Sequence, residues 1–168
     1  MKKVSRYFIL FITILSVSIG MFACKESSKT YITEDDIWNI MDEVEVATLN
    51  QDIDGVMKYL APSVVIHVTV SSPYGPQKVP MSREQYQKET LKGWSMMSGY
   101  DYRRENDEIM KISDDGQVAV VEMDVIESYV LKGEPLYTRT HERVTLQVVD
   151  GEILVTRIDA SMSMQEVI

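Results

Sequence analysis

Cysteine and histidine are scarce in this sequence, and their scarcity excludes several kinds of chemistry. Cys24 is the only cysteine, so the chain cannot form an internal disulfide. The two histidines, His67 and His141, fall on separate predicted strands, and no carboxylate stands at metal-ligand spacing from them. We therefore expect neither a metal site nor a bound cofactor.

Positive charge is also sparse. The chain has 17 lysine and arginine residues against 26 aspartate and glutamate residues, which gives a net charge of −9. Nucleic-acid binding depends on basic residues that neutralise phosphates, so we expect no nucleic-acid partner. Internal repeats and low-complexity blocks are absent, and the length suits a single domain behind a short leader.

Residues 1–23 have the layout of a secretory signal peptide. Lys2, Lys3 and Arg6 precede an uncharged run of 17 residues, 7–23, which is shorter than the ~20 residues that cross a bilayer core. The alternative is that this run remains as a permanent anchor helix. Removal of the segment with its three positive charges would take the net charge from −9 to −12.

The residues "MFAC" at the end of this segment resemble the lipobox of bacterial lipoproteins. The resemblance implies that Cys24 is diacylated and becomes the new N-terminus. Two acyl chains hold a protein stably on a membrane surface. We therefore expect a lipid-anchored protein of the cell envelope, with residues 24–32 as lipidated cysteine and polar tether. Lys25 resembles the sorting choice for the outer membrane, if the cell has two membranes.

Three helices are predicted from their N-terminal capping residues. Thr33 begins the first, which runs to about Asn50. Asp52 caps a short second helix, which Pro62 stops because the residue before a proline disfavours helical geometry. Ser82 caps a third helix that carries aromatic residues at helical spacing.

Five strands are predicted from β-branched runs and turns. The run "SVVIHVTV", residues 63–70, is the first, and the loop "SSPYGPQ" follows it. From Tyr100 onward the turns "DDGQ", "KGEP" and "VDGE" separate four further strands. Asp-Gly between alternating apolar residues is a strong hairpin signal, so these four strands form an antiparallel meander.

This order of elements is similar to the cone-shaped α+β fold of the nuclear transport factor 2-like superfamily, which includes SnoaL-type cyclases and ketosteroid isomerase. The phrases "YLAPSVVIHV", "DGQVAVVEMDVIESY" and "HERVTLQVVDGEILV" carry the resemblance, within a domain of residues 33–168. It implies three helices packed on a strongly curved antiparallel sheet, whose convex face is a candidate homodimer interface. The superfamily mixes enzymes, ligand binders and assembly domains, so the fold does not imply a function.

The turns also predict which strand residues lie opposite one another, and so which side chains share a face of the sheet. The side chains of the expected pairs fall on one face of the sheet. This face is apolar near the first and third turns and charged in its other half. A register slip of one residue would turn them to the opposite face. With hairpin tips at 115–116 and 150–151 and Leu131 closing on Leu136, the expected pairs are Arg104 with Glu127, Met110 with Val121, Glu127 with Thr140, Val144 with Arg157, and Glu142 with Asp159.

The charged half of that face is the candidate ligand cavity. Either arginine, Arg104 or Arg157, would grip a carboxylate, and repulsion between Glu142 and Asp159 would raise the pKa of one carboxyl group. Glu127 belongs to the same predicted group. The alternative is a cross-strand salt-bridge network at the open end of the cone, with no ligand.

His67 and several aromatic residues are further candidates. His67 would serve as an acid or base near neutral pH, or else is a surface or hydrogen-bonded histidine. Trp94 and Tyr86 on the third helix, with Tyr59 and Tyr102, are candidates to line an apolar pocket. The alternative is that these aromatic side chains belong to the core.

Three functions make different demands on this domain. A module that binds a small apolar or anionic molecule needs an open cavity with Arg104 or Arg157 pointing into it. A cofactor-free isomerase or cyclase needs a carboxylate or His67 with a strongly shifted pKa inside the cavity. An interaction lipoprotein needs a filled cone and a large apolar convex patch.

The resemblance to ketosteroid isomerase does not extend to its chemistry. Those relatives use a tyrosine on the first helix, and residues 34–50 contain none. The sequence therefore favours binding of a small molecule or a protein partner over catalysis.

Overall fold

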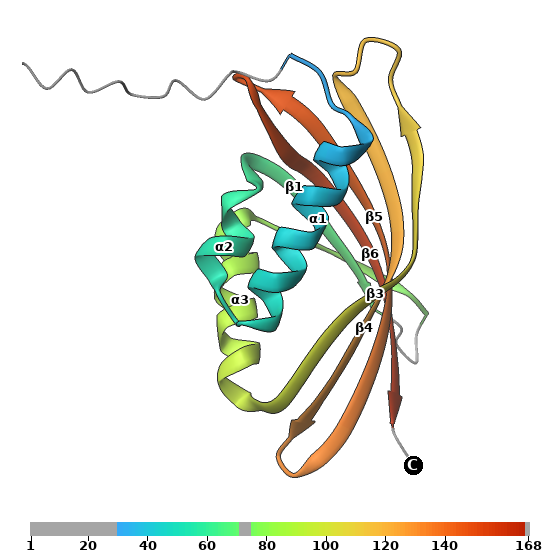
Figure 1. The fold of residues 1–168 in the computed structure, drawn as a ribbon. Coiled ribbons are helices and arrows are strands. Elements are labelled where there is room, and N and C mark those ends of the chain that lie inside the picture. Colours follow the sequence, from blue (N-terminus) through green and yellow to red (C-terminus); the bar gives the residue numbers. More distant parts are fainter. Residues whose placement is uncertain (1–29, 71–74, 167–168) are drawn as a thin grey trace, which may run out of the picture.

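The computed structural model describes residues 30–70 and 75–166 (Figure 1). The predicted signal peptide, 1–23, and Cys24 lie outside the described residues. Three helices, α1 (Glu34–Leu49), α2 (Ile53–Lys58) and α3 (Arg83–Met96), lie along one side of a curved sheet. The sheet consists of β1 (Leu60–Val70), β2 (Gln77–Met81), β3 (Met97–Ile112), β4 (Val118–Leu131), β5 (Glu134–Val149) and β6 (Glu152–Glu166).

The strands follow the order β2-β1-β6-β5-β4-β3, and all neighbours are antiparallel except β1 and β6, which are parallel. This arrangement confirms the predicted α+β fold of helices on a strongly curved sheet. The edge strand β2 was not predicted. It is short and contains Lys78 and Pro80, which discourage pairing with a further strand. Within the described part of the chain, no helix has the length and apolar character to cross a membrane.

Local capping signals explain where the helices begin. The Thr33 hydroxyl accepts a hydrogen bond from the Asp36 backbone N–H at 3.2 Å, and the Asp36 carboxylate accepts one from the Thr33 N–H at 3.1 Å. Ser82 and Gln85 form the same reciprocal capping box at 3.1 and 2.9 Å. Each box satisfies two backbone donors that the helix itself leaves unpaired.

Removal of the second cap gives a simple stability test. We expect Ser82→Ala to lower the free energy of unfolding by about 1 kcal/mol, because the Gln85 N–H loses its acceptor. Urea denaturation measures the change. Ser95→Ala, on the exposed surface of the same helix, is the control and should change stability by less than about 0.5 kcal/mol. Equal effects of the two substitutions would contradict the capping role.

The second helix ends earlier than predicted. It stops at Lys58, and Pro62 lies inside β1 instead of behind the helix. The register between β1 and β6 shifts between Leu60 and Val65, so Pro62 lies where the pairing is irregular. Irregular positions tolerate proline because they need no ladder hydrogen bond from its nitrogen.

The core occupies the half of the inner face that was predicted to be apolar. Ala119, Val121 and Leu146 have no exposed surface, and they cluster with Ile37 of α1, which is equally buried. Burial of these side chains from three elements holds α1 against β4 and β5. The other half of the inner face lies farther from this core and borders the site described below.

The β3–β4 and β4–β5 registers differ from the prediction without changing faces. Lys132 and Gly133 both have positive φ, 54° and 87°, so the β4–β5 turn is tighter than expected and Glu127 lies opposite Thr138 instead of Thr140. Between the turn at 115–116 and Arg104, the register of the β3–β4 pairing shifts twice, by one residue each time. Arg104 therefore lies opposite Val125 instead of Glu127. Each shift exchanges the two faces of the strand, so two shifts return Arg104 to the face that was predicted.

Met110 lies at the first of these irregularities, between Ile109 and Lys111, and its predicted position is wrong. Val121 lies opposite Ile109, and the Met110 side chain is 46% exposed. Met110 is the extra residue of the first shift and has no partner on β4, so Ile109 takes the place opposite Val121 that was predicted for Met110.

The β5–β6 pairing has one irregularity, beside Thr145, and this one has a larger consequence. Beyond it, Glu142 lies opposite Ala160 instead of Asp159, and Arg157 lies opposite Thr145 instead of Val144. A single-residue shift exchanges the faces of a strand. Arg157 and Asp159 therefore lie on the outer face, and their predicted place beside Glu142 is wrong.

Candidate functional site

A cavity of about 340 Å³ lies between the helices and the inner face of the sheet. Its size falls within the usual range of small-molecule sites. The cone is therefore hollow instead of filled. Most of its wall is apolar, and the side chains come from all layers of the fold, among them Met41, Leu60, Ile66, Val125, Ile158 and Met162.

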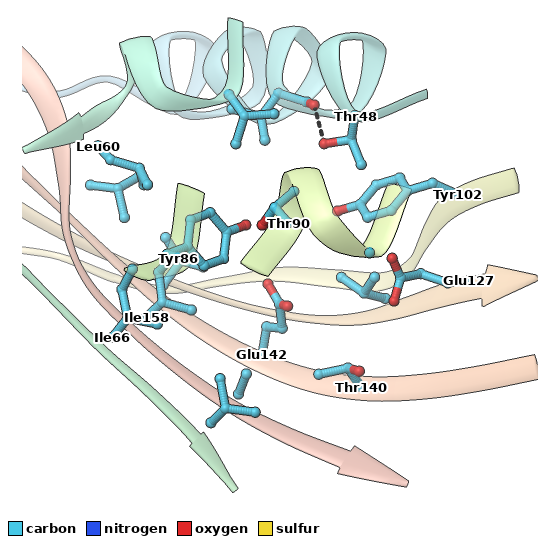
Figure 2. A pocket seen from close by; sticks show the side chains of 18 of the residues that line it. Thr48, Leu60, Ile66, Tyr86, Thr90, Tyr102, Glu127, Thr140, Glu142 and Ile158 are labelled. Carbon is cyan, nitrogen blue, oxygen red and sulfur yellow. Dashed lines mark hydrogen bonds between the residues drawn. The ribbon is translucent and has the colours of Figure 1, made fainter. Parts of the chain in front are cut away.

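A few polar side chains project into this apolar space. Figure 2 shows Tyr86 from α3, Tyr102 from β3, Glu127 from β4 and Glu142 from β5 around the same cavity. Thr90, one turn after Tyr86 on α3, brings its hydroxyl beside that of Tyr86. Few, converging polar groups in an apolar cavity are typical of a ligand site.

Glu127 is fixed by two hydroxyl groups. Tyr100 donates a hydrogen bond to one carboxylate oxygen at 2.6 Å, and Thr138 donates to the other at 3.3 Å. Thr138 is 1% exposed, and it lies opposite Glu127 in the β4–β5 ladder. Both oxygens of this carboxylate are thus held by the protein.

Glu142 is in the opposite situation. Its ladder neighbours are Met123 and Ala160, both buried and apolar, and among the described residues its carboxylate has no hydrogen-bond partner. The protein encloses Glu142, so the surface that it exposes faces the cavity. Burial and, as the smaller cause, the negative charge of Glu127 together raise the pKa of Glu142 to about 7.

Tyr86 and Tyr102 keep their protons. Burial raises the pKa of each phenol well above its ordinary value, and the charge of Glu142 adds to the effect. Both hydroxyls therefore remain donors at neutral pH. The cavity thus places neutral hydroxyl donors near an enclosed carboxyl group that can change its protonation state near neutral pH.

Arg104 lines the cavity, but its guanidinium is bound by protein carboxylates. Its Nε donates to Glu45 at 2.7 Å, its Nη2 donates to Asp42 at 2.6 Å, and its Nη1 lies 3.3 Å from Asp107. The side chain is 9% exposed. Glu45 and Asp42 come from α1, so Arg104 ties the first helix to β3. For Arg104 the structure shows a salt-bridge network, with partners that the hairpin registers did not predict.

The structure places His67, Arg157 and Asp159 together on the outer face of the sheet. Ile66 and Val68 flank His67 and line the cavity, so His67 itself points away from it. The His67 imidazole lies 3.1 Å from the Asp159 carboxylate, which also accepts hydrogen bonds from Arg157 and from Lys78. None of these three predicted site residues lines the cavity.

Further ion pairs occupy the outer face. Asp124 pairs with Arg139 at 2.8 Å and with His141 at 3.2 Å, and Glu122 pairs with Arg143 at 2.6 Å. These ion pairs place charged side chains on the outer surfaces of β4 and β5. Within the described ranges there is no group of three or more histidine, cysteine or acidic side chains that could hold a metal ion.

The predicted aromatic residues all belong to the cavity wall. Trp94, Tyr86, Tyr59 and Tyr102 line it, as does Tyr100, which the sequence analysis missed. Tyr100 is two residues from Tyr102 on β3, so the two-residue period of a strand was the signal that could have identified it. The Trp94 and Tyr100 rings meet edge to face, with centroids 6.5 Å apart.

No protein-family model matches this chain, and no curated protein sequence matches it. Solved structures do. A conserved protein from Planctomyces limnophilus DSM 3776 is 13% identical, with a TM-score of 0.64 over 77% of this chain and 94% of that one. An NTF2-like protein from Cytophaga hutchinsonii ATCC 33406 is 14% identical, with a TM-score of 0.60 over 79% and 100% of the two chains.

A third similar structure is the hexachlorocyclohexane dehydrochlorinase LinA-type3 from Novosphingobium barchaimii LL02, which is 11% identical, with a TM-score of 0.59 over 78% of this chain and 87% of that one. This chain has the nuclear transport factor 2-like fold. At such low identities the likeness extends to the fold alone. The function of this nuclear transport factor 2-like cone has to be inferred from its cavity.

Proposed function

We propose that the protein binds a small, largely apolar molecule in its cone. The observation that carries the proposal is the cavity of about 340 Å³, with an apolar wall and a few converging hydroxyl and carboxyl groups. One similar structure is a hexachlorocyclohexane dehydrochlorinase, and hexachlorocyclohexane is a small apolar compound. This name supports the proposal that a cone of this fold can hold such molecules.

Native mass spectrometry of the protein purified without denaturation tests the proposal. We expect a reproducible mass above that of the bare chain. Ala160→Phe should remove this extra mass, because Ala160 lines the cavity and a phenyl ring there would occupy ligand space. Ser161→Phe is the matched control, since the next residue of β6 is exposed and points to the outer face.

The result would contradict the proposal if the wild-type protein carried no ligand and bound no small apolar probe. An extra mass that persisted in Ala160→Phe would place the ligand elsewhere. The same spectra report the oligomeric state. The homodimer through the outer face stays a prediction, and a monomer at micromolar concentration would contradict it.

We also propose that the cone is tethered to the cell envelope through acylated Cys24. The support is in the sequence alone: a basic start, a 17-residue uncharged run and the residues "MFAC". The bilayer is then the partner of the N-terminus, at the outer membrane if the cell has two membranes. A tethered cone would hold its ligand close to the membrane.

Labelling with radioactive palmitate in a bacterial host tests the anchor. We expect the wild-type protein to incorporate label and to sediment with membranes, and Cys24→Ser to lose both properties. Lys25→Ser is a control for the sorting signal, because it keeps the acylated cysteine but changes the residue after it. Label retained in Cys24→Ser would contradict the proposal.

A second candidate function is favoured by Glu142. An enclosed carboxyl group whose pKa is raised to about 7 suits general acid–base catalysis at neutral pH. The protonated hydroxyls of Tyr86 and Tyr102 face the same cavity and would stabilise a developing oxyanion. A cofactor-free isomerase or lyase that abstracts a proton from a carbon acid is therefore the alternative to a binding module.

Proton exchange separates the two functions. The ketone 2-tetralone has acidic α-protons, and their replacement by deuterium in D₂O can be followed by proton NMR. An enzyme should accelerate the exchange over buffer, with a rate that rises as Glu142 loses its proton around pH 7. Glu142→Gln should abolish the acceleration. Exchange at the buffer rate with the wild-type protein would leave binding as the function.

A further inference from the structure

The charge balance of the cavity wall restricts which head group a ligand can carry. Among the described residues that line the cavity, Arg104 is the only lysine, arginine or histidine, and three carboxylates surround its guanidinium. Glu127 and Glu142 face the same space. An anionic ligand would meet the carboxyl groups of Glu127, Glu142 and the half-exposed Glu89, and the Arg104 guanidinium is already paired with protein carboxylates, so the cavity disfavours carboxylates and phosphates.

The carboxyl groups of Glu127 and Glu142 differ in what they can offer a ligand. Glu127 already accepts hydrogen bonds from Tyr100 and Thr138. Glu142 accepts none from the described residues, although an enclosed carboxylate without a partner is unfavourable. A hydrogen-bond donor with a positive charge would satisfy it fully.

The aromatic residues around Glu142 complete a site for a cation. The hydroxyl groups of Tyr86 and Tyr102 lie close enough to Glu142 for its charge to raise the pKa of both phenols, and both side chains line the cavity. Aromatic rings attract organic cations through their negative faces, and this attraction is strongest where water is excluded. Tyr100 and Trp94 extend the aromatic wall.

From this placement we propose that the cone binds a lipophilic amine in its ammonium form, with the ammonium group on the Glu142 carboxylate and the hydrocarbon body against the apolar wall. The inference rests on the proposed ligand-binding function and names its ligand class. The ammonium would supply the donor that Glu142 lacks, in a cavity that Tyr86 and Tyr102 also line.

Binding of an ammonium ion should be linked to the proton on Glu142. The groups that face this carboxyl are Glu127 from β4, Tyr86 from α3 and Tyr102 from β3, with Arg104 acting on Tyr102 from farther along β3. Both tyrosines stay neutral, so Glu142 is the group that titrates. Amine affinity should therefore rise between about pH 6 and pH 8 as Glu142 ionises, whereas the affinity of a neutral ligand should not.

Three probes with one carbon skeleton test the proposal by calorimetry on ligand-free protein: 4-phenylbutylamine, 4-phenylbutan-1-ol and 4-phenylbutyrate. The expected Kd of the amine at about pH 8 is at least about tenfold lower than that of the alcohol, because a hydrogen bond between charged groups is stronger than one between neutral groups. The acid should bind more weakly than the alcohol.

Glu142→Gln is the decisive variant, and Glu152→Gln, at the exposed first residue of β6, is its control because it removes the same charge from the surface. The amine preference should fall to within about twofold in Glu142→Gln and persist in Glu152→Gln. Binding of the alcohol by Glu142→Gln would show that the variant is folded with its cavity intact.

The outcomes separate the inference from the function on which it rests. If the alcohol binds as tightly as the amine, or the acid binds most tightly, the ligand class is wrong and the binding function stands. An amine preference that survives Glu142→Gln would place the amine on the acidic surface and overturn the inference. If none of the three probes binds, both proposals are overturned.

Discussion

Replacement of Glu142 by glutamine is expected to stabilise the ligand-free protein at pH 8 by about 3 kcal/mol, with no gain below pH 4.5. The cause is the raised pKa of Glu142, about 7 in the folded protein against an ordinary value of 4.5. The folded state encloses the carboxyl group among apolar neighbours. The unfolded state returns it to water, where its charge is solvated.

The direction of the pH dependence follows from proton binding. Below pH 4.5 both states hold the proton on Glu142, and between 4.5 and about 7 only the folded state holds it. The folded state therefore binds more protons in this window, and the stability of the wild-type protein falls as the pH rises through it. Glutamine does not ionise, so the variant escapes this loss.

Urea denaturation of both proteins at several pH values between 5 and 8 measures the effect. The difference in unfolding free energy should grow with pH and level off above about 7. Glu152→Gln, at the exposed first residue of β6, should show no such growth. A constant difference across the range would mean that Glu142 is not the titrating group.

A stabilising substitution at Glu142 would bear on function as well. Residues that lower stability are commonly retained where activity or binding needs them. A glutamine, similar in size, would fill the same place without the penalty of a buried charge. Its stabilising effect, combined with loss of amine binding or of proton exchange, would identify Glu142 as the functional group of the cavity.

Arg104→Met is expected to have the opposite effect and to destabilise the protein by about 3 kcal/mol. Arg104 is 9% exposed, and it compensates the charges of Glu45, Asp42 and Asp107. Removal of one partner from a buried ion-pair network leaves the remaining charges without compensation. The substitution would also loosen the connection between α1 and β3.

The adjacent arginine provides a matched control. Arg103 is 55% exposed and pairs with Glu105, so Arg103→Met should change the unfolding free energy by less than about 1 kcal/mol. A double-mutant cycle then isolates the pair: Glu45→Gln should cost less stability in the Arg104→Met background than in the wild type. Equal effects of the two arginine substitutions would show that the network does not hold α1 in place.

The same substitution distinguishes the two interpretations of Arg104. If it bound an anionic ligand, Arg104→Met would weaken 4-phenylbutyrate selectively. Because three carboxylates already pair with its guanidinium, we expect instead that Arg104→Met changes the stability of the protein but not the relative affinities of the three probes.

The elements that depend on neighbouring residues could be predicted from the sequence. The capping boxes at Thr33 and Ser82 act within one turn of helix, and the hairpin tips at 115–116 and 150–151 depend on a few turn residues. The order of these elements was sufficient to predict the cone. The edge strand β2 was missed because it has only five residues and contains Pro80, which is a signal against a strand.

The cavity could be predicted only in part. Trp94, Tyr102, Glu127 and Glu142 were placed on the inner surface, and the structure places them there. The partners of Arg104 could not be foreseen, because Glu45 lies 59 positions away along the chain and on a helix. Contacts between a helix and a distant strand depend on how the layers pack, which hairpin registers do not describe.

The sequence by itself therefore determined the three helices, five of the six described strands and their order, the acidic surface and the lipobox-like leader. The tertiary structure decided which side chains face the cavity. Side chains alternate along a strand with a period of two, so the single irregularity beside Thr145 was enough to move Arg157 and Asp159 to the outer face and leave Glu142 inside without them. Such an irregularity arises from the pairing of two strands within a curved sheet, and neither strand encodes it alone.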